Sequence, residues 1–267
     1  MWEIFLRTIK DRKISIIIYI VASIGFMWMY IAMFPSIQDQ ADQFQELMKS
    51  YPQEFMKAFN IEELSFDKIE KFLAMENFSI IWPLMVIFMM ISLAGAAISG
   101  EIEKGTAEII LSKPVSRLKI FIGKYLAGVF ILAVFTACSV FFVAPLCTLH
   151  NVDYVMENYV HMAAIGFLFG LAVYSVALMF SAMFSERSKP YMFTGGILIL
   201  MYVANIVANL KDQLKNFKYL SFFHYYNQNQ ALIHNNLEIN SILVFAGVAI
   251  ICTIVGVIYF NKRDIAV

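Results

Sequence analysis

The sequence predicts an all-α integral membrane protein with six transmembrane helices, and two observations support this fold class. Of its 267 residues, 60% are hydrophobic and only 15% are charged, whereas soluble domains carry about 45–50% apolar and about 25% charged residues. The chain also contains six apolar runs of about the length that a helix needs to cross a bilayer core, roughly 20 residues. This composition argues against a soluble enzyme, a nucleic-acid-binding protein and a disordered protein.

The first expected element is an amphipathic helix over residues 1–13, which lies in the membrane interface before the first span. Its apolar side chains alternate with basic ones, and basic amphipathic helices bind membrane surfaces. The apolar runs then place transmembrane helices at residues 14–34, 78–99, 125–149, 159–184, 191–208 and 241–260. Helices are expected because a backbone in lipid must satisfy its own hydrogen bonds, and barrel strands are shorter and alternate in polarity.

The distribution of charge predicts that both termini lie in the cytoplasm. Thirteen of the 20 lysines and arginines fall on the side of the N-terminus, together with only seven of the 20 acidic residues. Cytoplasmic loops of membrane proteins carry an excess of lysine and arginine. Because six spans return the chain to the side where it began, the C-terminus is expected there as well.

Two of the three outer connections are long enough to fold. Residues 35–77 are acidic and carry apolar side chains at helical spacing, so extracellular helices packed on the outer surface are expected there. Residues 150–158 are a short loop. Residues 209–240 combine three lysines with an aromatic run, and aromatic residues prefer the membrane interface. That pattern predicts a connection that dips into the outer leaflet.

The inner loop of residues 100–124 is the most informative segment. Thr106 can cap a helix whose first turn contains Glu108, a favourable place for an acidic residue. Pro114 ends this helix, since the residue before a proline avoids the helical region, and Ser116 can cap the next helix, which continues into the third span. A simple link would need only a few polar residues. A loop with two helix caps therefore indicates a docking surface, with a short helix parallel to the membrane and charged residues towards the cytosol.

This loop does not predict a nucleotide site. Gly100 and Gly105 have the spacing of a phosphate-binding loop, but Thr106 and Ala107 stand where lysine and then serine or threonine are required. The four histidines and three cysteines show no metal-ligand spacing. We expect no cofactor or metal in this chain.

Several short motifs in the inner loop carry a family resemblance. They are Gly100-Glu101, Glu103-Lys104-Gly105-Thr106, Glu108, Leu111-Ser112, Pro114-Val115-Ser116-Arg117 and Gly123-Lys124. Together they resemble the signature of type-2 ABC exporter permeases, and the ending from Tyr259 to Asp264 resembles the ends of many of these proteins. The layout of the whole chain, residues 1–267, is similar to a single transmembrane permease domain. Within the family it is most similar to bacterial permeases that serve the export of antimicrobial, bacteriocin or toxin peptides.

The resemblance implies a bacterial inner-membrane permease that works with a separate cytoplasmic ABC ATPase subunit, which binds ATP and magnesium. It also implies a homodimer, or a pair with a homologous permease, and a coupling helix at about Gly105–Ser112. The residues implied at or near the ATPase contact are Glu101, Glu103, Lys104, Gly105, Thr106 and Glu108, and those that shape the loop are Pro114 and Arg117. The implied cargo is amphipathic or hydrophobic, with peptide first and lipid-linked molecules or hydrophobic drugs second.

Three alternatives stay open. A membrane-embedded enzyme or peptidase would need ionisable groups inside the bilayer, and the central parts of the six expected spans lack aspartate, glutamate, lysine and arginine. A sensory or immunity protein could bind a peptide without moving it. The inner loop could also be held at the lipid headgroups by its basic residues, Arg117, Lys119 and Lys124.

Overall fold

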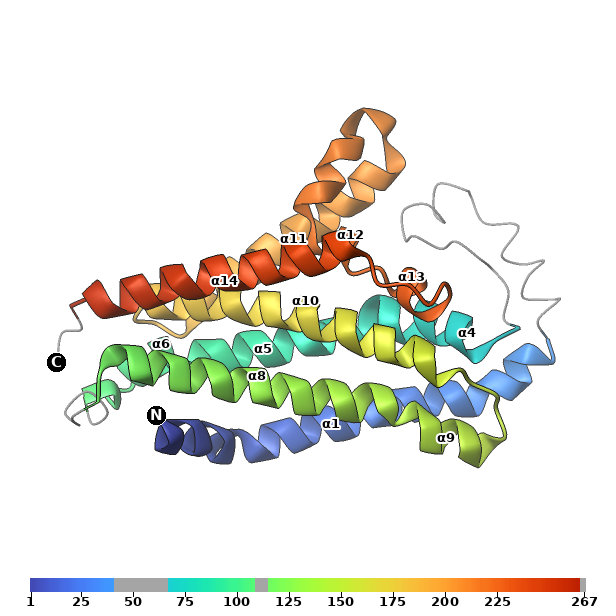
Figure 1. Ribbon diagram of the computed structural model, residues 1–267, viewed down its shortest axis with the longest axis horizontal. Coiled ribbons are helices and arrows are strands. Elements are labelled where there is room, and N and C mark those ends of the chain that lie inside the picture. Colours follow the sequence, from blue (N-terminus) through green and yellow to red (C-terminus); the bar gives the residue numbers. More distant parts are fainter. Residues whose placement is uncertain (41–66, 109–114, 265–267) are drawn as a thin grey trace.

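The computed structural model describes residues 1–40, 67–108 and 115–264, and all regular structure in these ranges is helical (Figure 1). Six helical stretches in the described part are long and apolar enough to cross a membrane. They are Trp2–Gln38, Ile69–Ala97, Arg117–His150, Met156–Met183, Ser188–Leu210 and Ile239–Lys262. The fold class predicted from the sequence, an all-α integral membrane protein with six spans, is therefore confirmed.

Helix α1 (Trp2–Gln38) joins the two elements expected at the start of the chain. The amphipathic segment of residues 1–13 and the first span form one continuous helix, which also passes through Pro35. The helix ends beyond the predicted boundary at Phe34. Most of its side chains are exposed, and those that are buried lie on one stripe, at Ser23, Met27, Ile31 and Phe34. That stripe faces the rest of the bundle.

The second span consists of three consecutive helical segments. Helix α4 (Ile69–Glu76) leads into a π-helix, η1 (Asn77–Ile81), and then into α5 (Trp82–Ala97), which has Pro83 in its first turn. The second span therefore begins nine residues before the predicted start at Phe78. Most of the segment in which extracellular helices are expected, residues 41–66 of 35–77, lies outside the described residues.

The third span is divided near its C-terminal end. Helix α8 (Arg117–Phe141) begins at the predicted Ser116 cap, where the Ser116 hydroxyl accepts a hydrogen bond from the Lys119 amide at 3.4 Å. Helix α9 (Val143–His150) follows after Phe142. A left-handed Asn151 (φ 54°) ends α9, which is a usual way for a helix to terminate.

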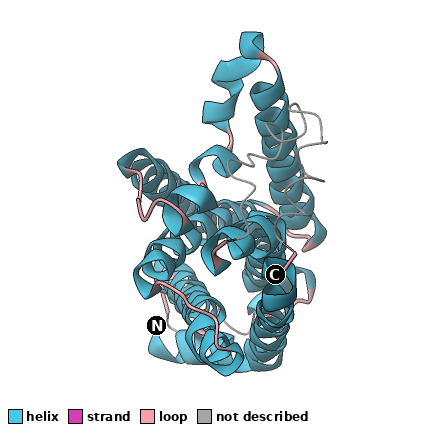
Figure 2. Cartoon of the chain, turned by 90° about the vertical axis from the view of Figure 1, so that its right-hand side faces the viewer, coloured by secondary structure: helices cyan, strands magenta, loops and turns pink. Residues whose placement is uncertain are grey.

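The last three spans are α10 (Met156–Met183), α11 (Ser188–Leu210) and α14 (Ile239–Lys262). Helix α10 is central, because it packs against α5, α8, α11 and α14. The connection between α11 and α14 contains the 3-10 helix η2 (Asp212–Leu220), α12 (Phe222–Tyr225) and α13 (Gln228–Leu232). The end of α11 and η2 project from the bundle (Figure 1), and Figure 2 shows the same projection from the side.

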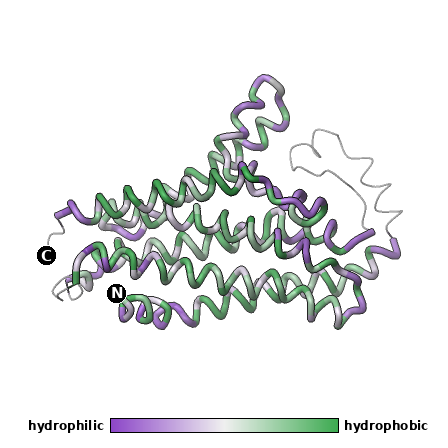
Figure 3. The backbone as a smooth tube through the Cα atoms, in the orientation of Figure 1, coloured by the Kyte–Doolittle hydropathy of each residue, from purple (hydrophilic) through white to green (hydrophobic). Residues whose placement is uncertain are grey.

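Both termini lie at one end of the bundle, together with the turn after α5 (Figure 1). The backbone coloured by hydropathy is predominantly apolar along the spans and polar towards their ends (Figure 3). We call the end with both termini the charged end. It is formed by residues 1–13, 98–108, 115–124, 182–191 and 260–264.

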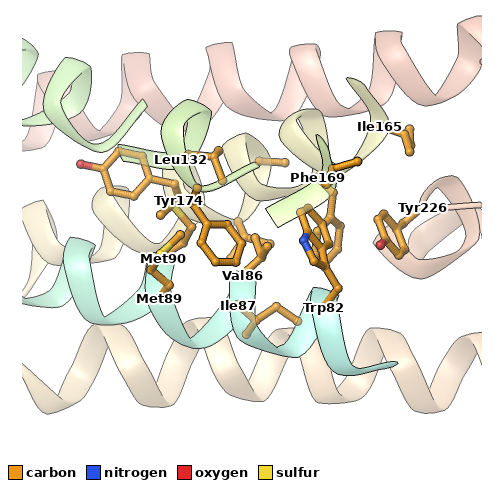
Figure 4. Packing of buried hydrophobic residues seen from close by; sticks show 14 of the residues in the cluster. Trp82, Val86, Ile87, Met89, Met90, Leu132, Ile165, Phe169, Tyr174 and Tyr226 are labelled. Carbon is orange, nitrogen blue, oxygen red and sulfur yellow. The ribbon is translucent and has the colours of Figure 1, made fainter. Parts of the chain in front are cut away.

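Aromatic and aliphatic side chains together fill the core between α5, α8 and α10 (Figure 4). Trp82 is fully buried and donates its indole N–H to the Ser139 hydroxyl at 2.8 Å. Its ring is parallel to that of Tyr226, and Tyr226 lies 4.8 Å from Phe169, centroid to centroid. The Tyr226 hydroxyl donates to the Phe78 carbonyl within the π-helix at 3.0 Å. The connection between α11 and α14 is thereby fixed to the second span.

The small residues of α10 allow this close packing. A Cβ atom on Gly166 would lie 2.4 Å from the Trp82 ring, and one on Gly170 would lie 2.6 Å from Leu132. These two glycines therefore serve contacts within the chain. The same holds for Gly100, which faces the Gly95 carbonyl and Arg187.

We predict that Gly166→Ala lowers the free energy of unfolding by about 1–3 kcal/mol, because the Trp82 ring must move in a packed core. Gly247→Ala in α14 is the matched control, since no atom lies within 4 Å of its added Cβ, and it should change stability by no more than about 1 kcal/mol. Thermal unfolding in detergent measures both. Equal effects of the two variants would contradict the packing described here.

Candidate functional site

The site predicted from the sequence lies at the charged end, where the segment after α5 reverses direction. The helix is interrupted at Ile98, and α6 (Ser99–Glu103) follows. The amides of Ile98 and Ser99 donate to the Ser181 hydroxyl of α10 at 3.3 and 3.0 Å. A helix start has amides without partners in the helix, and Ser181 satisfies two of them. Helix α10 therefore fixes where α6 begins.

Lys124 of α8 forms a buried ion pair with Glu101 of α6. The two side chains meet at 2.5 Å, and they are 3% and 29% exposed, respectively. The Lys124 ammonium also donates to the Ala97 carbonyl at the end of α5. Tyr174 of α10, itself buried, donates to the Lys124 main-chain carbonyl at 2.9 Å. A single lysine thus connects α5, α6 and α8.

The ion pair matters because a buried ammonium without a partner is costly. Transfer of a charge from water into a protein interior costs several kcal/mol, which only a close partner and further hydrogen bonds offset. Glu101 and the Ala97 carbonyl supply these contacts to Lys124. The structure therefore places Glu101 against Lys124 inside the chain, with part of its carboxylate exposed at the surface.

Glu103 contacts the start of α11. Its carboxylate accepts a hydrogen bond from the Arg187 amide at 3.0 Å. The Arg187 guanidinium donates to the Tyr191 hydroxyl at 2.9 and 3.1 Å, and Tyr191 donates to the Ser92 hydroxyl of α5 at 3.2 Å. The end of α6 is therefore also connected to α11.

A tight turn follows α6. Gly105 has a left-handed backbone (φ 69°), which glycine adopts without the steric cost that other residues carry. The Thr106 hydroxyl donates to the Glu101 carbonyl at 3.2 Å. Lys104 and Gly105 are exposed. Gly105 thus allows the chain to turn back directly after α6.

A helical conformation begins again at Ala107 and Glu108, and Glu108 is exposed. The rest of the expected coupling helix, up to Ser112, lies outside the described residues, and so does Pro114.

Arg117 and Arg263 bind the ends of two spans. Arg117 donates to the Phe260 carbonyl at 3.2 Å and to the Arg263 carbonyl. Arg263 donates to the Ala182 and Phe184 carbonyls at 3.1 and 2.9 Å, and to the Ser185 hydroxyl. Burial lowers the pKa of Arg263, but a guanidinium stays charged in proteins. These acceptors replace the water that the guanidinium loses.

Sequence reasoning missed several residues of this network. Ser181, Arg187, Tyr191 and Arg263 were not singled out, and Lys124 was named only within a motif and as a possible headgroup contact. One signal was present for Lys124, which lies among apolar residues two turns after the helix cap at Ser116. In residues 1–40, 67–108 and 115–264, no three histidine, cysteine, aspartate or glutamate side chains gather where they could hold a metal ion.

A comparison with protein families identifies the chain. Residues 2–265 match the model of the ABC-2 family transporter proteins. The match covers nearly the whole chain, so the chain belongs to this family, as the motifs of the inner loop predicted. It is a multi-pass transmembrane subunit of an ABC transporter, a family that implies a partner ATPase subunit. No curated protein matches the sequence.

We predict that Glu101→Gln lowers the free energy of unfolding by about 3 kcal/mol, because Lys124 then stays buried without an opposite charge. The double variant Glu101→Gln/Lys124→Met should recover most of this loss, since methionine fills the same space without a charge. Thermal unfolding in detergent measures the three proteins.

The control for this series is Glu108→Gln, which removes an exposed carboxylate and should change stability by less than about 0.5 kcal/mol. A double variant less stable than Glu101→Gln alone would show that the ion pair does not act as described.

Proposed function

We propose that this transporter subunit is an exporter permease of a bacterial cytoplasmic membrane, and that its charged end is where the ATPase docks. The observation that carries the proposal is the connection of α6 to four spans. Glu101 contacts Lys124 of α8, Glu103 contacts the start of α11, and Ser181 of α10 binds the junction of α5 and α6. A force applied to the turn at residues 104–106 would reach these helices through short polar contacts.

The expected contact residues differ in how free they are to meet a partner. Glu101 is paired with Lys124, and the exposed Glu103 accepts a hydrogen bond from the Arg187 amide. Lys104 and Glu108 are also exposed, but they form no ion pair with another described residue. We infer that Lys104 and Glu108 contact the ATPase directly. Glu101 and Glu103 would then transmit the movement, and Arg117 would hold the base of the loop.

The orientation belongs to the same proposal. Both termini and the turn after α6 lie at the charged end, and the excess of basic residues over acidic ones is on this side. That excess supports a cytoplasmic location for both termini. An ATPase in the cytoplasm could then reach residues 104–108.

We also propose a dimer with a second copy of this chain. The spans α1, α11 and α14 bury few of their side chains within one chain, so these faces are available to lipid or to a partner. Helix α11 carries Met192, Ile199 and Leu200 with their side chains exposed. Cargo would cross between the two copies.

The cargo that we favour is an amphipathic peptide. The sequence resembles permeases of peptide exporters, and it contains 16 methionines and 25 phenylalanines. Methionine-rich surfaces adapt to apolar partners of varied shape. Lipid-linked molecules and hydrophobic drugs are the second choice.

The double variant Lys104→Glu/Glu108→Lys tests docking. Both side chains are exposed, so the fold should be retained, while reversed charges at an interface should reduce co-purification of the ATPase roughly tenfold or more. The ATPase for this test is the candidate from a neighbouring reading frame.

The proposed dimer is tested by light scattering on the wild-type complex, which should give two copies of each subunit.

Asp153→Lys is the matched control, because it reverses an exposed charge at the opposite end of the bundle. It should leave co-purification unchanged. If Lys104→Glu/Glu108→Lys retains the full complex and its ATPase activity, the charged end is not the docking surface.

The cargo is tested with the complex reconstituted in proteoliposomes. Amphipathic peptides should stimulate its ATPase activity more than hydrophobic drugs or added lipid, because transported molecules favour the state that hydrolyses ATP. The docking variant Lys104→Glu/Glu108→Lys should abolish the stimulation. A complex that responds to drugs and not to peptides would contradict the choice of peptide.

A further inference from the structure

The charged end contains a cavity of about 670 Å³ beside the turn after α6. One side is formed by the first three turns of α1, and the other sides by α5, α6, the beginning of α8 and Arg187 before α11. Its volume is within the range of sites that bind small molecules, about 300–1,000 Å³.

Positive charge dominates the lining. The cavity is bordered by five basic side chains and three acidic ones, namely Arg7, Arg12, Lys104, Lys124 and Arg187 against Glu3, Asp11 and Glu101. The acidic side chains are largely engaged. Glu101 is paired with Lys124 at 2.5 Å, and Asp11 with Arg7 at 3.6 Å.

Within the described ranges, two guanidinium groups at the cavity form no ion pair with a carboxylate. Arg12 is half-buried, and within the described residues it makes no hydrogen bond or ion pair. Arg187 donates its guanidinium to the Tyr191 hydroxyl, a neutral group. The two guanidiniums also repel each other across the cavity. The neighbouring Asp11 carboxylate attracts Arg12, but it already forms an ion pair with Arg7. Two like charges without ion-pair partners of their own are unfavourable, and an anion between them would offset the repulsion.

The other residues of the lining indicate which kind of molecule the anionic group belongs to. Leu93, Ala96 and Ala97 of α5 give the cavity an apolar border beside its charged groups. Arg12 precedes the apolar run of the first span, which begins at Ile14, by two residues, so we expect it near the level where this helix leaves the bilayer core. The site therefore combines an apolar region with a cationic one. Basic pockets between transmembrane helices bind anionic lipid headgroups.

We propose that this cavity binds the phosphate of an anionic membrane phospholipid, held between Arg12 and Arg187. The planar guanidinium forms two parallel hydrogen bonds to phosphate oxygens. The glycerol and the upper acyl chains lie against Leu93 and Ala96. This inference concerns the isolated chain and does not depend on the ATPase docking proposed above.

The test uses the purified full chain in detergent, without an ATPase. Dioctanoyl phosphatidylglycerol, dioctanoyl phosphatidylcholine and inorganic phosphate are titrated separately. Binding is followed by the midpoint of thermal unfolding and by native mass spectrometry. The wild-type chain should bind phosphatidylglycerol and be stabilised by it, and the other two compounds should have little effect at the same concentrations.

Arg12→Gln should weaken the binding of phosphatidylglycerol roughly tenfold, because a charge-assisted contact to phosphate is lost. Without lipid, the same variant should unfold at the wild-type temperature or above it, since it removes a repulsion. Lys13→Gln is the matched control, because it neutralises the neighbouring exposed cation outside the cavity lining. It should bind phosphatidylglycerol as the wild-type chain does.

Three results would overturn the proposal. One is equal binding of phosphatidylglycerol by Arg12→Gln and the wild-type chain. Another is equal stabilisation of the wild-type chain by phosphatidylcholine, which would mean that the cavity does not select an anionic headgroup. The third is saturation by inorganic phosphate at the same concentration, which would identify a free anion as the ligand. The lipid comparison on the wild-type chain needs no variant, and loss of ATPase docking would leave all of these measurements unaffected.

Discussion

The arrangement of the charged end depends on the burial of one lysine. The Lys124 side chain is 3% exposed, so its ammonium must find acceptors inside the protein. The acceptors are the carboxylate of Glu101 in α6 and the carbonyl of Ala97 at the end of α5. Because an unpaired buried charge costs several kcal/mol, α6 has little freedom to move away from α8. The turn at Gly105 and the exposed residues after it are therefore presented from a fixed base.

Other polar contacts extend this connection to the remaining helices at the same end. Arg117 and Arg263 bind carbonyl groups where α14 and α10 end, and helix ends have carbonyls without intrahelical partners. The negative end of the helix dipole favours these cations as well. At the opposite end, the contacts described here are largely aromatic, with Trp82, Phe169 and Tyr226 packed together. An ion pair and arginine contacts thus connect the charged end, whereas the opposite end combines ring packing with hydrogen bonds such as those from Tyr226 to the Phe78 carbonyl and from the Val155 amide to the Glu70 carboxylate.

The spans were predictable from the sequence because each needs only length and apolarity, which are local properties. The cap at Ser116 was predictable for the same reason. The π-helix at Asn77–Ile81 was not, since it is accompanied by the contact of Tyr226 with the Phe78 carbonyl, nearly 150 residues away in the chain. The small residues of α10 could be recognised, but the partner of a small residue depends on the packing of the whole bundle. Gly166 faces Trp82 of the same chain.

The sequence predicts which segment forms the candidate site, but it does not predict what each charged residue of that segment contacts. The charged residues of the inner loop look alike in the sequence, yet the structure divides them by their partners. Glu101 pairs with Lys124 and Glu103 binds the Arg187 amide, while the exposed Lys104 and Glu108 have no ion-pair partner among the described residues. A charge that already has a buried partner contributes little to a new interface, because its field is largely neutralised nearby. An exposed charge without such a partner still acts on a molecule that approaches.

The same distinction separates Lys124, which Glu101 neutralises, from Arg12 and Arg187, which have no carboxylate partner at the cavity. The position of a basic residue in the sequence therefore does not show whether it stabilises the fold or binds a ligand. Its role depends on whether a carboxylate of the same chain lies beside it.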